Sequence, residues 1–505
     1  MKYVLTNAQM RSADEYTITQ KSISALSLME RAGKALFDEA QKLAPHGKIL
    51  CLCGGGNNGG DGFVCARYLF LKGREVETVF FATKATDECQ INRSEYEMLG
   101  GKLKSYVPQE RYTLIIDCLF GTGFHGELTG EFAQAAKQVN ELRLLGARVL
   151  SADIPSGVNG DNGFAAKFAV QADVTLCFGE IKAGVYMGDG PDYAGEIKRA
   201  DIGVFLPELD HGYAFLSDKE QVSALLPKRK RNCHKGCHGK TAIVAGSEKY
   251  KGAAYLSMLG ALRSGVGYTT LFVPEGIKQD YVLKCPEAIL ESSNAGNEFA
   301  FDEDVFIRLC EFDSIAFGMG MGVSEEVAVA VKYLLKHYQG KLLLDADALN
   351  ALSVYEQDNL PQIFSQKQCE VVLTPHVKEF SRLSGKTVKE ILSDGLTACQ
   401  AFAQSLGVCV LLKNAATVVC DGTTNRTTLN VAGAAGQAKG GSGDLLSGMI
   451  AGLCGIGLSA FDAARAGAYL TGKAAELASL EFGDYSLLAT DVAAYMGRAF
   501  LSLRR

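Results

Sequence analysis

The chain alternates short apolar runs with amphipathic segments of helical period, and this alternation limits the folds that it can adopt. A first series predicts strands at 48–53, 75–81, 113–117, 148–153 and 174–178, and helices at 24–36, 63–71, 88–99 and 131–142. Continuous apolar strands separated by helices are typical of a parallel sheet with helices on both faces. The sequence therefore predicts an α/β fold.

A second series of the same kind follows a less regular stretch at 201–235. It predicts strands at 241–245, 268–273, 313–317, 341–345, 370–374, 408–412 and 417–420, and helices at 253–264, 324–335, 397–405, 444–453 and 460–480. A length of 505 residues agrees with two or more domains. We place the boundary near residue 218, which gives domains 1–218 and 219–505.

Composition argues against several classes of partner. The formal net charge is −6, which gives no sign of a nucleic-acid or membrane partner. The sequence has no apolar run of about 18 residues, and its first residues lack the pattern of a secretion signal. The 15 cysteines are scattered and often lie inside apolar runs, as reduced thiols do. We therefore expect a cytoplasmic protein.

The run Gly440-Gly441-Ser442-Gly443-Asp444 stands directly before an apolar helical segment. Such a loop points backbone N–H groups and the positive end of a helix dipole at one anion. A carboxylate there would repel a phosphate, so Asp444 is predicted to take a proton from a hydroxyl that attacks the phosphate. The alternative is a packing turn in which Asp444 is an ordinary acid of the first helical turn.

Other polar groups follow the predicted strands of the second series. They are Gly318–Gly322, Asp345-Ala346-Asp347, Thr374-Pro375-His376 and Lys413-Asn414. The carboxyl ends of parallel strands form the ligand crevice of an open α/β sheet. These groups are therefore expected around the anion loop.

A second glycine-rich segment, 54–62, follows the first strand of the first series. Loops at 118–126 and 154–160 follow two further strands, so the three loops are expected to converge. Asn58, Asp117 and Ser156 offer hard oxygens without surplus charge, which suit a weakly held monovalent cation better than a transition metal.

A basic run and a cluster of cysteines and histidines lie between the two series, and neither is assigned a binding site. For the basic run at 228–231, a solvated surface is favoured over a phosphate clamp. Cys233, His234, Cys237 and His238 are possible zinc ligands, but four ligands on one short segment cannot easily reach tetrahedral positions together. We therefore assign no metal there and expect a loop at the edge of the carboxyl-terminal pocket.

The motifs resemble those of bifunctional NAD(P)H-hydrate repair enzymes, in which an epimerase domain is fused to an ADP- or ATP-dependent dehydratase. The resemblance covers essentially the whole chain. It rests on the segments 57–62, 151–157, 234–236, 246–247, 252–254, 345–349, 373–376 and 440–444. It implies a Rossmann-like three-layer sandwich at the amino end and a ribokinase-like α/β domain at the carboxyl end.

For the dehydratase, the resemblance implies that a hydrated nicotinamide lies between Ala253, Gly320 and His376, with Asp444 as the base. The residues implied to hold the adenine nucleotide are Lys413, Asn414, Ala415, Ala416, Thr417, Gly440, Gly441, Ser442 and Gly443. ADP is the expected co-substrate, together with Mg²⁺. The implied reaction phosphorylates the C6 hydroxyl of the S hydrate and then eliminates phosphate, which gives NAD(P)H, AMP and phosphate.

For the epimerase, the resemblance implies K⁺ at Asn58, Asp117 and Ser156. The implied substrate-binding residues are Asn57, Asn58, Gly59, Gly60, Asp61, Gly121, Thr122, Gly123, Phe124, His125, Gly126, Glu127 and Asp153. Exchange of the R and S hydrates needs one group that moves a proton, and we choose Asp153. The alternative for Asp153 is an Asx cap on the turn into Pro155.

Lys182 and His125 are candidates of a different kind. Lys182 is expected to be a surface lysine or a support for the loop, with a helper role in catalysis as the alternative. His125 is expected to bind substrate or to be exposed, rather than to act as a base.

Two rival functions stay open at this point. One is a ribokinase-like small-molecule kinase with a Rossmann-like accessory domain, which shares the anion loop. The other makes the first domain a non-catalytic binding module. We expect a homo-oligomer whose ligands are NADHX or NADPHX and an adenine nucleotide.

Overall fold

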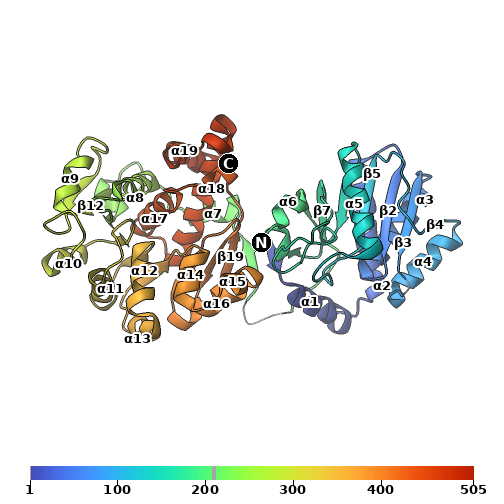
Figure 1. The fold of residues 1–505 in the computed structure, drawn as a ribbon, viewed down its shortest axis with the longest axis horizontal. Helices are drawn as coiled ribbons and strands as arrows, with labels where there is room; N and C mark the ends of the chain where they lie inside the picture. The colour runs from blue at the N-terminus through green and yellow to red at the C-terminus, as the bar shows by residue number, and fades with distance from the viewer. Residues whose placement is uncertain (1, 83, 208–211, 505) are drawn as a thin grey trace. The chain divides into compact units, whose positions relative to one another are not determined.

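The computed structural model describes residues 2–82, 84–207 and 212–504, and it divides into two compact units, Met1–Tyr213 and Ala214–Arg505. Each unit is an α/β fold with helices packed on its strands (Figure 1). The α/β class predicted from the sequence is confirmed. Among the described helices, none is long and apolar enough to cross a bilayer.

The first unit is built on a parallel sheet in the order β4-β3-β2-β5-β6-β7-β9. The strands are β2 (Ile49–Gly54), β3 (Val76–Phe81), β4 (Leu103–Lys104), β5 (Leu114–Cys118), β6 (Arg148–Ala152), β7 (Val174–Phe178) and β9 (Glu196–Ala200). Two short strands, β1 (Tyr3–Leu5) and β8 (Ile181–Lys182), pair in parallel beside it. The helices are α1 (Asn7–Gln20), α2 (Ala25–Leu43), α3 (Asn57–Leu71), α4 (Asp87–Met98), α5 (Gly130–Leu144) and α6 (Gly190–Ala194), with a 3₁₀ turn η1 (Ala183–Val185).

Alternate residues of the central strand β2 enter two separate cores. Cys51 and Cys53 pack in a cluster with α2, α3 and α4, whereas Leu50 and Leu52 pack on the other face with α5. The side chains of a strand point alternately to opposite faces, so a strand covered on both sides is apolar throughout. This arrangement is why β2 reads as one continuous apolar run.

The structure corrects the prediction in two places that matter for the first site. The predicted glycine loop at 54–62 is helical from Asn57 onward, because α3 begins there. The helix α1 was not predicted. Thr6 and Gln9 form a capping box at its start, but its sequence carries only a weak apolar stripe, so periodicity gave little signal.

The second unit contains the strand order β13-β12-β11-β14-β15-β16-β17-β18-β19-β10. The strands are β10 (Ala214–Leu216), β11 (Lys240–Val244), β12 (Tyr268–Val273), β13 (Ile289–Ser292), β14 (Ser314–Phe317), β15 (Lys341–Leu344), β16 (Glu370–Leu373), β17 (Cys409–Leu412), β18 (Thr417–Asp421) and β19 (Thr427–Asn430). Neighbours from β13 to β17 are parallel, but β18 is antiparallel to both β17 and β19. This antiparallel part was not predicted.

The helices of the second unit connect these strands. They are α7 (Lys219–Leu225), α8 (Lys251–Ser264), α9 (Glu275–Lys278), α10 (Glu303–Leu309), α11 (Glu325–His337), α12 (Asp347–Tyr355), α13 (Leu360–Ser365), α14 (Val377–Ser384), α15 (Val388–Ser393), α16 (Gly395–Leu406), α17 (Ser442–Gly455), α18 (Ala460–Ser486) and α19 (Ala489–Ser502). Short 3₁₀ turns lie at η2 (Lys235–His238), η3 (Gln279–Tyr281), η4 (Gln357–Asn359) and η5 (Ala435–Gln437).

Helices α8 and α17 cross with almost no space between their backbones. A Cβ atom on Gly448 would lie 1.8 Å from the Ser257 carbonyl oxygen, and a Cβ atom on Gly260 would lie 2.2 Å from the Leu445 carbonyl oxygen. The glycines of this crossing therefore fix where α17 begins, and with it the position of the anion loop.

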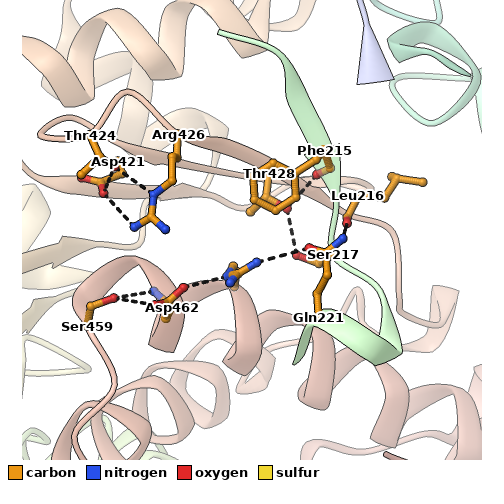
Figure 2. Close-up of polar contacts among 11 residues, drawn as sticks. Phe215, Leu216, Ser217, Gln221, Asp421, Thr424, Arg426, Thr428, Ser459 and Asp462 are labelled. Carbon is orange, nitrogen blue, oxygen red and sulfur yellow. Dashed lines mark hydrogen bonds and ion pairs between the residues drawn. The ribbon is translucent and has the colours of Figure 1, made fainter. Parts of the chain in front are cut away.

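The second unit begins with β10, a few residues before the boundary that we placed near 218. β10 pairs in parallel with β19, from Ala214 opposite Thr427 to Leu216 opposite Leu429. Figure 2 shows the polar contacts that attach this segment: Thr428 Oγ1 donates to the Phe215 carbonyl oxygen at 2.8 Å and lies 2.9 Å from Ser217 Oγ. A strand of three residues is too short to stand out in the sequence.

Candidate active sites

The first unit contains a cavity of about 600 Å³ at the carboxyl ends of its central strands. Several of the predicted substrate residues line it, namely Asn57, Asn58, Asp61, Gly121, Thr122, Gly123, Phe124 and Asp153. Helices α1 and α2 contribute further lining residues, among them Met10, Asp14 and Met29. The segments at the ends of β2, β5 and β6 thus meet in one hollow, together with a helix that was not predicted.

Asp153 follows β6 in a left-handed conformation, with φ of +66°. Its backbone N–H donates to the Leu176 carbonyl oxygen at 2.8 Å, and its Oδ1 accepts from the Phe178 N–H at 3.0 Å. A non-glycine residue with positive φ is strained and is most often found at functional sites. The carboxylate is directed to β7 and Lys182, and so it does not act as the cap of the turn into Pro155.

Lys182 is buried beside this carboxylate, so the expectation of a surface lysine is wrong. Its side chain is 1% exposed, its ammonium is ion-paired with Asp153 Oδ1, and Nζ donates to the Phe178 carbonyl oxygen at 2.7 Å. A lysine in an apolar stretch next to glycine carries no sequence sign of its ion pair. Only the pairing of short strand β8 with β1 turns this side chain inward.

Asp14 and Asp61 add two more carboxyl groups to the cavity. Burial raises the pKa of Asp14 to about 6; Lys182 opposes that rise, whereas Asp153 adds to it. Burial also raises the pKa of Asp61 well above its usual range, and the charge of Asp153 adds to the effect. Asp61 is therefore suited to carry a proton near neutral pH, and Asp14 exchanges its proton near pH 6, both beside the ion pair of Asp153 and Lys182.

Asn58, Asp117 and Ser156 come together at one edge of the cavity. Ser156 Oγ donates to Asp117 Oδ1 at 2.6 Å and accepts from the Phe120 N–H at 2.9 Å. Asn58 Nδ2 donates to the Phe120 carbonyl oxygen at 2.8 Å, whereas Asn58 Oδ1 is buried and has no hydrogen-bond partner among the described residues. An orphaned buried oxygen next to other hard oxygens fits a weakly bound alkali cation.

Other predicted substrate residues lie elsewhere. Gly59 and Gly60 pack the first turn of α3, since a Cβ atom on Gly59 would lie 1.8 Å from the Gly54 carbonyl oxygen and one on Gly60 would lie 2.5 Å from Met29 Sδ. His125, Gly126 and Glu127 are exposed beyond the residues that line the cavity. The exposure of His125 agrees with the expectation that it is not a base.

The anion loop of the second unit forms the start of α17. Gly441 is the N-cap residue, with φ of +94°, and the first N–H groups of any helix have no partner inside it. Gly443 faces the preceding β17–β18 connection, since a Cβ atom on it would lie 3.3 Å from Lys413 Nζ. The loop and Lys413, which the sequence placed in one nucleotide site, are neighbours.

A buried network lies beneath this loop. Lys413 Nζ donates to Asp345 Oδ1 at 2.8 Å, and Ser447 Oγ donates to Asp345 Oδ2 at 2.6 Å. Burial raises the pKa of Asp444 to about 6; the charge of Asp345 adds to the rise and Lys413 opposes it. Asp444 is therefore a base whose proton affinity lies near neutral pH, which is the range that general-base catalysis requires.

Asp345 and Ser447 are site residues that sequence reasoning did not assign. The signal for Asp345 was present, because an Asp-Ala-Asp run that ends an apolar strand is unusual. Ala346 between the two acids has φ of +49°, a second strained residue at a strand end. Asp347 Oδ2 accepts from the Gly322 N–H at 2.9 Å and so ties the Gly318–Gly322 loop to this site.

Ala253 and Gly320 lie in contact, as the resemblance implied for one pocket. A Cβ atom on Gly320 would lie 2.8 Å from the Cβ atom of Ala253, and Gly320 has φ of +66°. Ser247 Oγ donates to the Gly320 carbonyl oxygen at 2.9 Å. Glycine at this position allows the loop to pack against the start of α8 more closely than any side chain would permit.

His376 is the N-cap of α14 and is paired with Glu379 in a capping box. Its Nδ1 accepts from the backbone N–H groups of Lys378 and Glu379 at 3.1 and 3.2 Å, so the ring proton is on Nε2. Burial lowers the pKa of His376, and the charge of Lys413 lowers it further. Burial raises the pKa of Glu379 to about 7, against the opposing charge of Lys413. His376 is thus held as a neutral donor.

The remaining residues of the nucleotide set surround the connection after Lys413. Asn414 and Ala415 are exposed, Ala416 is buried, and Thr417 opens β18. His376 and Lys413 form an isolated parallel bridge, which holds the ends of β16 and β17 together. The residues predicted to bind the hydrated nicotinamide and those predicted to bind the nucleotide therefore both lie at the carboxyl ends of the strands.

Cys233, His234, Cys237 and His238 lie at the opposite ends of the strands. Their segment precedes β11, and the His238 carbonyl oxygen accepts from Gly267, just before β12. The expectation that this segment edges the carboxyl-terminal pocket is wrong. Within the described residues, no group of three or more His, Cys, Asp or Glu side chains is placed to hold a metal ion.

Comparison with known families accounts for both units. Residues 25–184 match the family model described as "YjeF-related protein N-terminus", and residues 241–498 match the model of NAD(P)H-hydrate dehydratase. The chain is 32% identical to the bifunctional NAD(P)H-hydrate repair enzyme of Moorella thermoacetica, over 97% of this chain and 95% of that protein. It is 30% identical to the corresponding enzyme of Leishmania major, over 95% and 90%.

Solved structures agree with this result for the second unit. The ADP/ATP-dependent NAD(P)H-hydrate dehydratase of Bacillus subtilis, co-crystallised with ATP and Mg²⁺, is 30% identical with a TM-score of 0.50, and the match covers 58% of this chain and 99% of that one. A ribokinase-like superfamily protein of Enterococcus faecalis, 24% identical with a TM-score of 0.50, shows the same fold. The predicted ribokinase-like fold is confirmed. The chain belongs to the family of bifunctional NAD(P)H-hydrate repair enzymes.

Proposed function

We propose that the two units perform consecutive steps in the repair of hydrated nicotinamide cofactors. The first unit exchanges the R and S forms of NAD(P)HX, and the second dehydrates the S form to NAD(P)H with consumption of ADP, which gives AMP and phosphate. The observation that carries the proposal is Asp444, a carboxyl group with a raised pKa at the start of an anion-binding helix beside Lys413. Family membership favours this function over a small-molecule kinase.

In the second unit, Asp444 takes the proton of the C6 hydroxyl as that oxygen attacks the terminal phosphate of ADP. The backbone N–H groups of Gly440–Gly443 and the ammonium of Lys413 stabilise the charge that develops on the transferred group. Asp345 and Ser447 hold Lys413 in place. Elimination of phosphate then restores the dihydropyridine, because phosphate is a far better leaving group than hydroxide. Mg²⁺ enters with the nucleotide.

The nicotinamide side of this pocket is formed by the wall at Ala253 and Gly320 and by His376. His376 carries its ring proton on Nε2, because its Nδ1 is occupied by the start of α14; Nε2 lies 3.4 Å from Glu379 Oε1, and we propose that it donates to the substrate when the substrate is bound. Lys413 to Thr417 and the anion loop hold the adenine nucleotide. This division puts the acceptor hydroxyl and the donor phosphate on either side of Asp444.

In the first unit, Asp153 acts as the acid/base at C6 of the hydrate. Lys182 is ion-paired with Asp153 and fixes its orientation. Asp61 supplies a protonated carboxyl group that can hydrogen-bond the substrate, and Asp14 exchanges its proton near pH 6. Asn58, Asp117 and Ser156 fit K⁺, and the orphaned Asn58 Oδ1 supports this assignment. A bound K⁺ would supply positive charge that holds polar substrate groups at the cavity edge.

Incubation of the purified protein with a mixture of R and S NADHX tests the proposal. With ADP, Mg²⁺ and K⁺ present, the near-ultraviolet absorbance of NADH should return until both forms are consumed. Return of only half the absorbance would exclude the epimerase step, and no return would exclude the dehydratase. Parallel assays with ATP test the choice of ADP, and a K⁺ to Na⁺ exchange should slow only the R form.

We also propose a cytoplasmic location and assembly of several copies of this chain. Cell fractionation checks the first, and light scattering at several protein concentrations checks the second. A monomer at every concentration would exclude the homo-oligomer.

A further inference from the structure

The second unit carries another cavity, of about 1000 Å³, that the repair reaction does not use. It is lined by residues before β11 and by the ends of several helices, among them the C-cap residue of α17, Ile456. The anion loop of the dehydratase lies at the other end of α17. A helix of 14 residues is about 21 Å long, so this cavity and the anion loop lie at opposite ends of the same helix.

The lining of this cavity is strongly basic. Lys228, Arg229, Lys230, Arg263 and Arg504 all contribute to it, and no aspartate or glutamate does among the residues that the structure describes. They come from three separate parts of the chain, although the protein as a whole has a net charge of −6. Convergence of cations from distant segments on one concave surface distinguishes this cavity from an ordinary solvated face.

Four helix ends partly offset this charge. The C-cap residues Leu226, Gly265, Ile456 and Leu503, of α7, α8, α17 and α19, all line the cavity. A helix carboxyl end carries about half a negative charge, so four ends supply about −2 against five full positive charges. The surplus is about +3. Helix capping therefore accounts for only part of the basic cluster.

The hydrogen bonds and ion pairs of the basic side chains also indicate a surplus of positive charge. The Arg229 guanidinium donates to the Gly265 carbonyl oxygen and so caps α8. Among the described residues, the side chains of Lys228, Lys230, Arg263 and Arg504 have no hydrogen bond, ion pair or ring contact. Four cations face one cavity without a partner, where each would gain a charge-assisted hydrogen bond from an anion.

An apolar wall completes the site. Leu226, Ile456, Phe500 and Leu503 line the same cavity. Its volume is that of a site for a sizeable organic ligand rather than for an inorganic ion. Charge and apolar surface side by side are what a ligand with several phosphates on an organic body needs.

We propose that this cavity binds an organic polyphosphate, such as a nucleoside triphosphate, at a site separate from the catalytic nucleotide site. The phosphates contact Lys228, Lys230, Arg263 and Arg504, and the organic part packs on Leu226 and Phe500. Nucleic acid is disfavoured as an occupant, because the basic residues surround one local cavity on an acidic protein and do not form an extended basic surface.

Cys237 provides a direct readout of the site. It lines the cavity together with Cys233. All the cysteines lie within the described residues, and Cys237 is the only one of them that is exposed. The rate at which neutral iodoacetamide alkylates Cys237, followed by peptide mass spectrometry on the full-length protein, therefore reports occupancy without any use of catalysis.

Inorganic tripolyphosphate and ATP are the probes. Both should slow alkylation of Cys237 at least threefold with saturation, whereas sodium chloride of equal ionic strength should not. ATP should reach half-protection at a concentration at least threefold below that of tripolyphosphate, because only ATP can contact the apolar wall. Equal half-protection would overturn the organic part of the proposal, and no protection would overturn the site itself.

Matched variants separate this site from general charge effects. Lys228→Gln/Arg263→Gln should lose the protection, whereas Lys386→Gln/Lys389→Gln, which removes two exposed cations of the same unit, should keep it. Protection that survives Lys228→Gln/Arg263→Gln would contradict the proposal. Asp444→Asn should leave protection unchanged, so failure of this proposal and failure of the repair function give different results.

Discussion

Single residues set the chemistry of both sites through burial next to one charged neighbour. Asp153 is ion-paired with the buried Lys182, whereas burial and the charge of Asp345 raise the pKa of Asp444 to about 6 against the opposing charge of Lys413. A carboxylate is costly to bury alone, and each site supplies one lysine to compensate. Asp14 in the first site and Asp444 in the second, each with a pKa of about 6, can therefore change protonation state near neutral pH.

Replacement of Asp444 by Asn tests the base. The dehydratase rate should fall by about 10²- to 10⁴-fold, which is the usual contribution of a general base. In the unchanged protein, the base works only when deprotonated, so the dehydratase rate should rise as pH increases through about 6. Initial rates with saturating S-NADHX and ADP from pH 5 to 8 check both points. Exchange of R and S forms should be unchanged, and a variant that retains a tenth of the activity would exclude the base role.

Replacement of Lys182 by Met tests the buried ion pair of the first unit. The change leaves the Asp153 carboxylate buried without its partner, which costs about 3–5 kcal/mol of unfolding free energy. Urea denaturation measures this loss, and epimerase activity should vanish while dehydratase activity remains.

Two controls separate the lost pair from a general effect of removing a lysine. Lys34→Met removes an ion pair with Asp38 whose side chains are 43% and 49% exposed, and it should cost less than about 1 kcal/mol. Lys182→Met/Asp153→Asn should recover much of the stability without activity. Equal losses for Lys182→Met and Lys34→Met would show that the pair does not stabilise the fold.

At the scale of elements, the close crossing of α8 and α17 positions the anion loop. Gly448 at the crossing has no room for a side chain, whereas Gly497, inside the exposed face of α19, has nothing within 4 Å of its would-be Cβ atom. Gly448 is therefore required by helix packing, whereas no packing contact requires a glycine at position 497.

Substitution of each glycine by alanine makes this contrast measurable. Gly448→Ala should destabilise the second unit by about 1–3 kcal/mol, because the helices must separate. It should also lower dehydratase activity through displacement of Gly443 and Asp444. Gly497→Ala should stabilise by about 0.5–1 kcal/mol, because alanine is the better helix former. Thermal unfolding checks the signs, and destabilisation by both changes would contradict the packing argument.

The elements that the sequence predicted well are those with a strong local pattern. Buried parallel strands such as β7 and β12 were found at their bounds, because continuous apolar runs between turns have few other interpretations. Helix α1, strand β10 and the inward direction of Lys182 were missed, because each depends on tertiary pairing. Asp14 was missed with α1, and Asp345 was seen at its strand end but not assigned to the buried network.

The start of α3 shows a third kind of error. The glycines and asparagines at 57–62 have low helix propensity, so a loop was predicted. Tertiary packing against β2 and Met29 overrides that propensity. As a result, Asn58 and Asp61 lie one helical turn apart and both reach the cavity.

At the scale of the molecule, the two units divide between Tyr213 and Ala214, and each contains a complete candidate site. The second unit corresponds to a protein that exists alone, since the Bacillus subtilis dehydratase is matched over 99% of its length. We expect residues 1–213 and 214–505 to fold when expressed separately, the first with epimerase and the second with dehydratase activity. A cooperative thermal transition and an assay of each fragment check this.

The control for this experiment divides the chain at a different position. Division after residue 218 would remove β10 from the second unit and leave β19 paired on one side only, with β18, so that fragment 219–505 should unfold at a lower temperature than 214–505. Equal melting temperatures would show that β10 adds nothing to the second unit.

Because both sites belong to one polypeptide, every molecule that is synthesised delivers the isomer-exchanging and the nucleotide-consuming step in a fixed one-to-one ratio. Expression level can change the overall flux but not the balance between the two catalysts. A cell that uses this arrangement therefore avoids a build-up of the unusable stereoisomer whenever supply of the enzyme rises or falls.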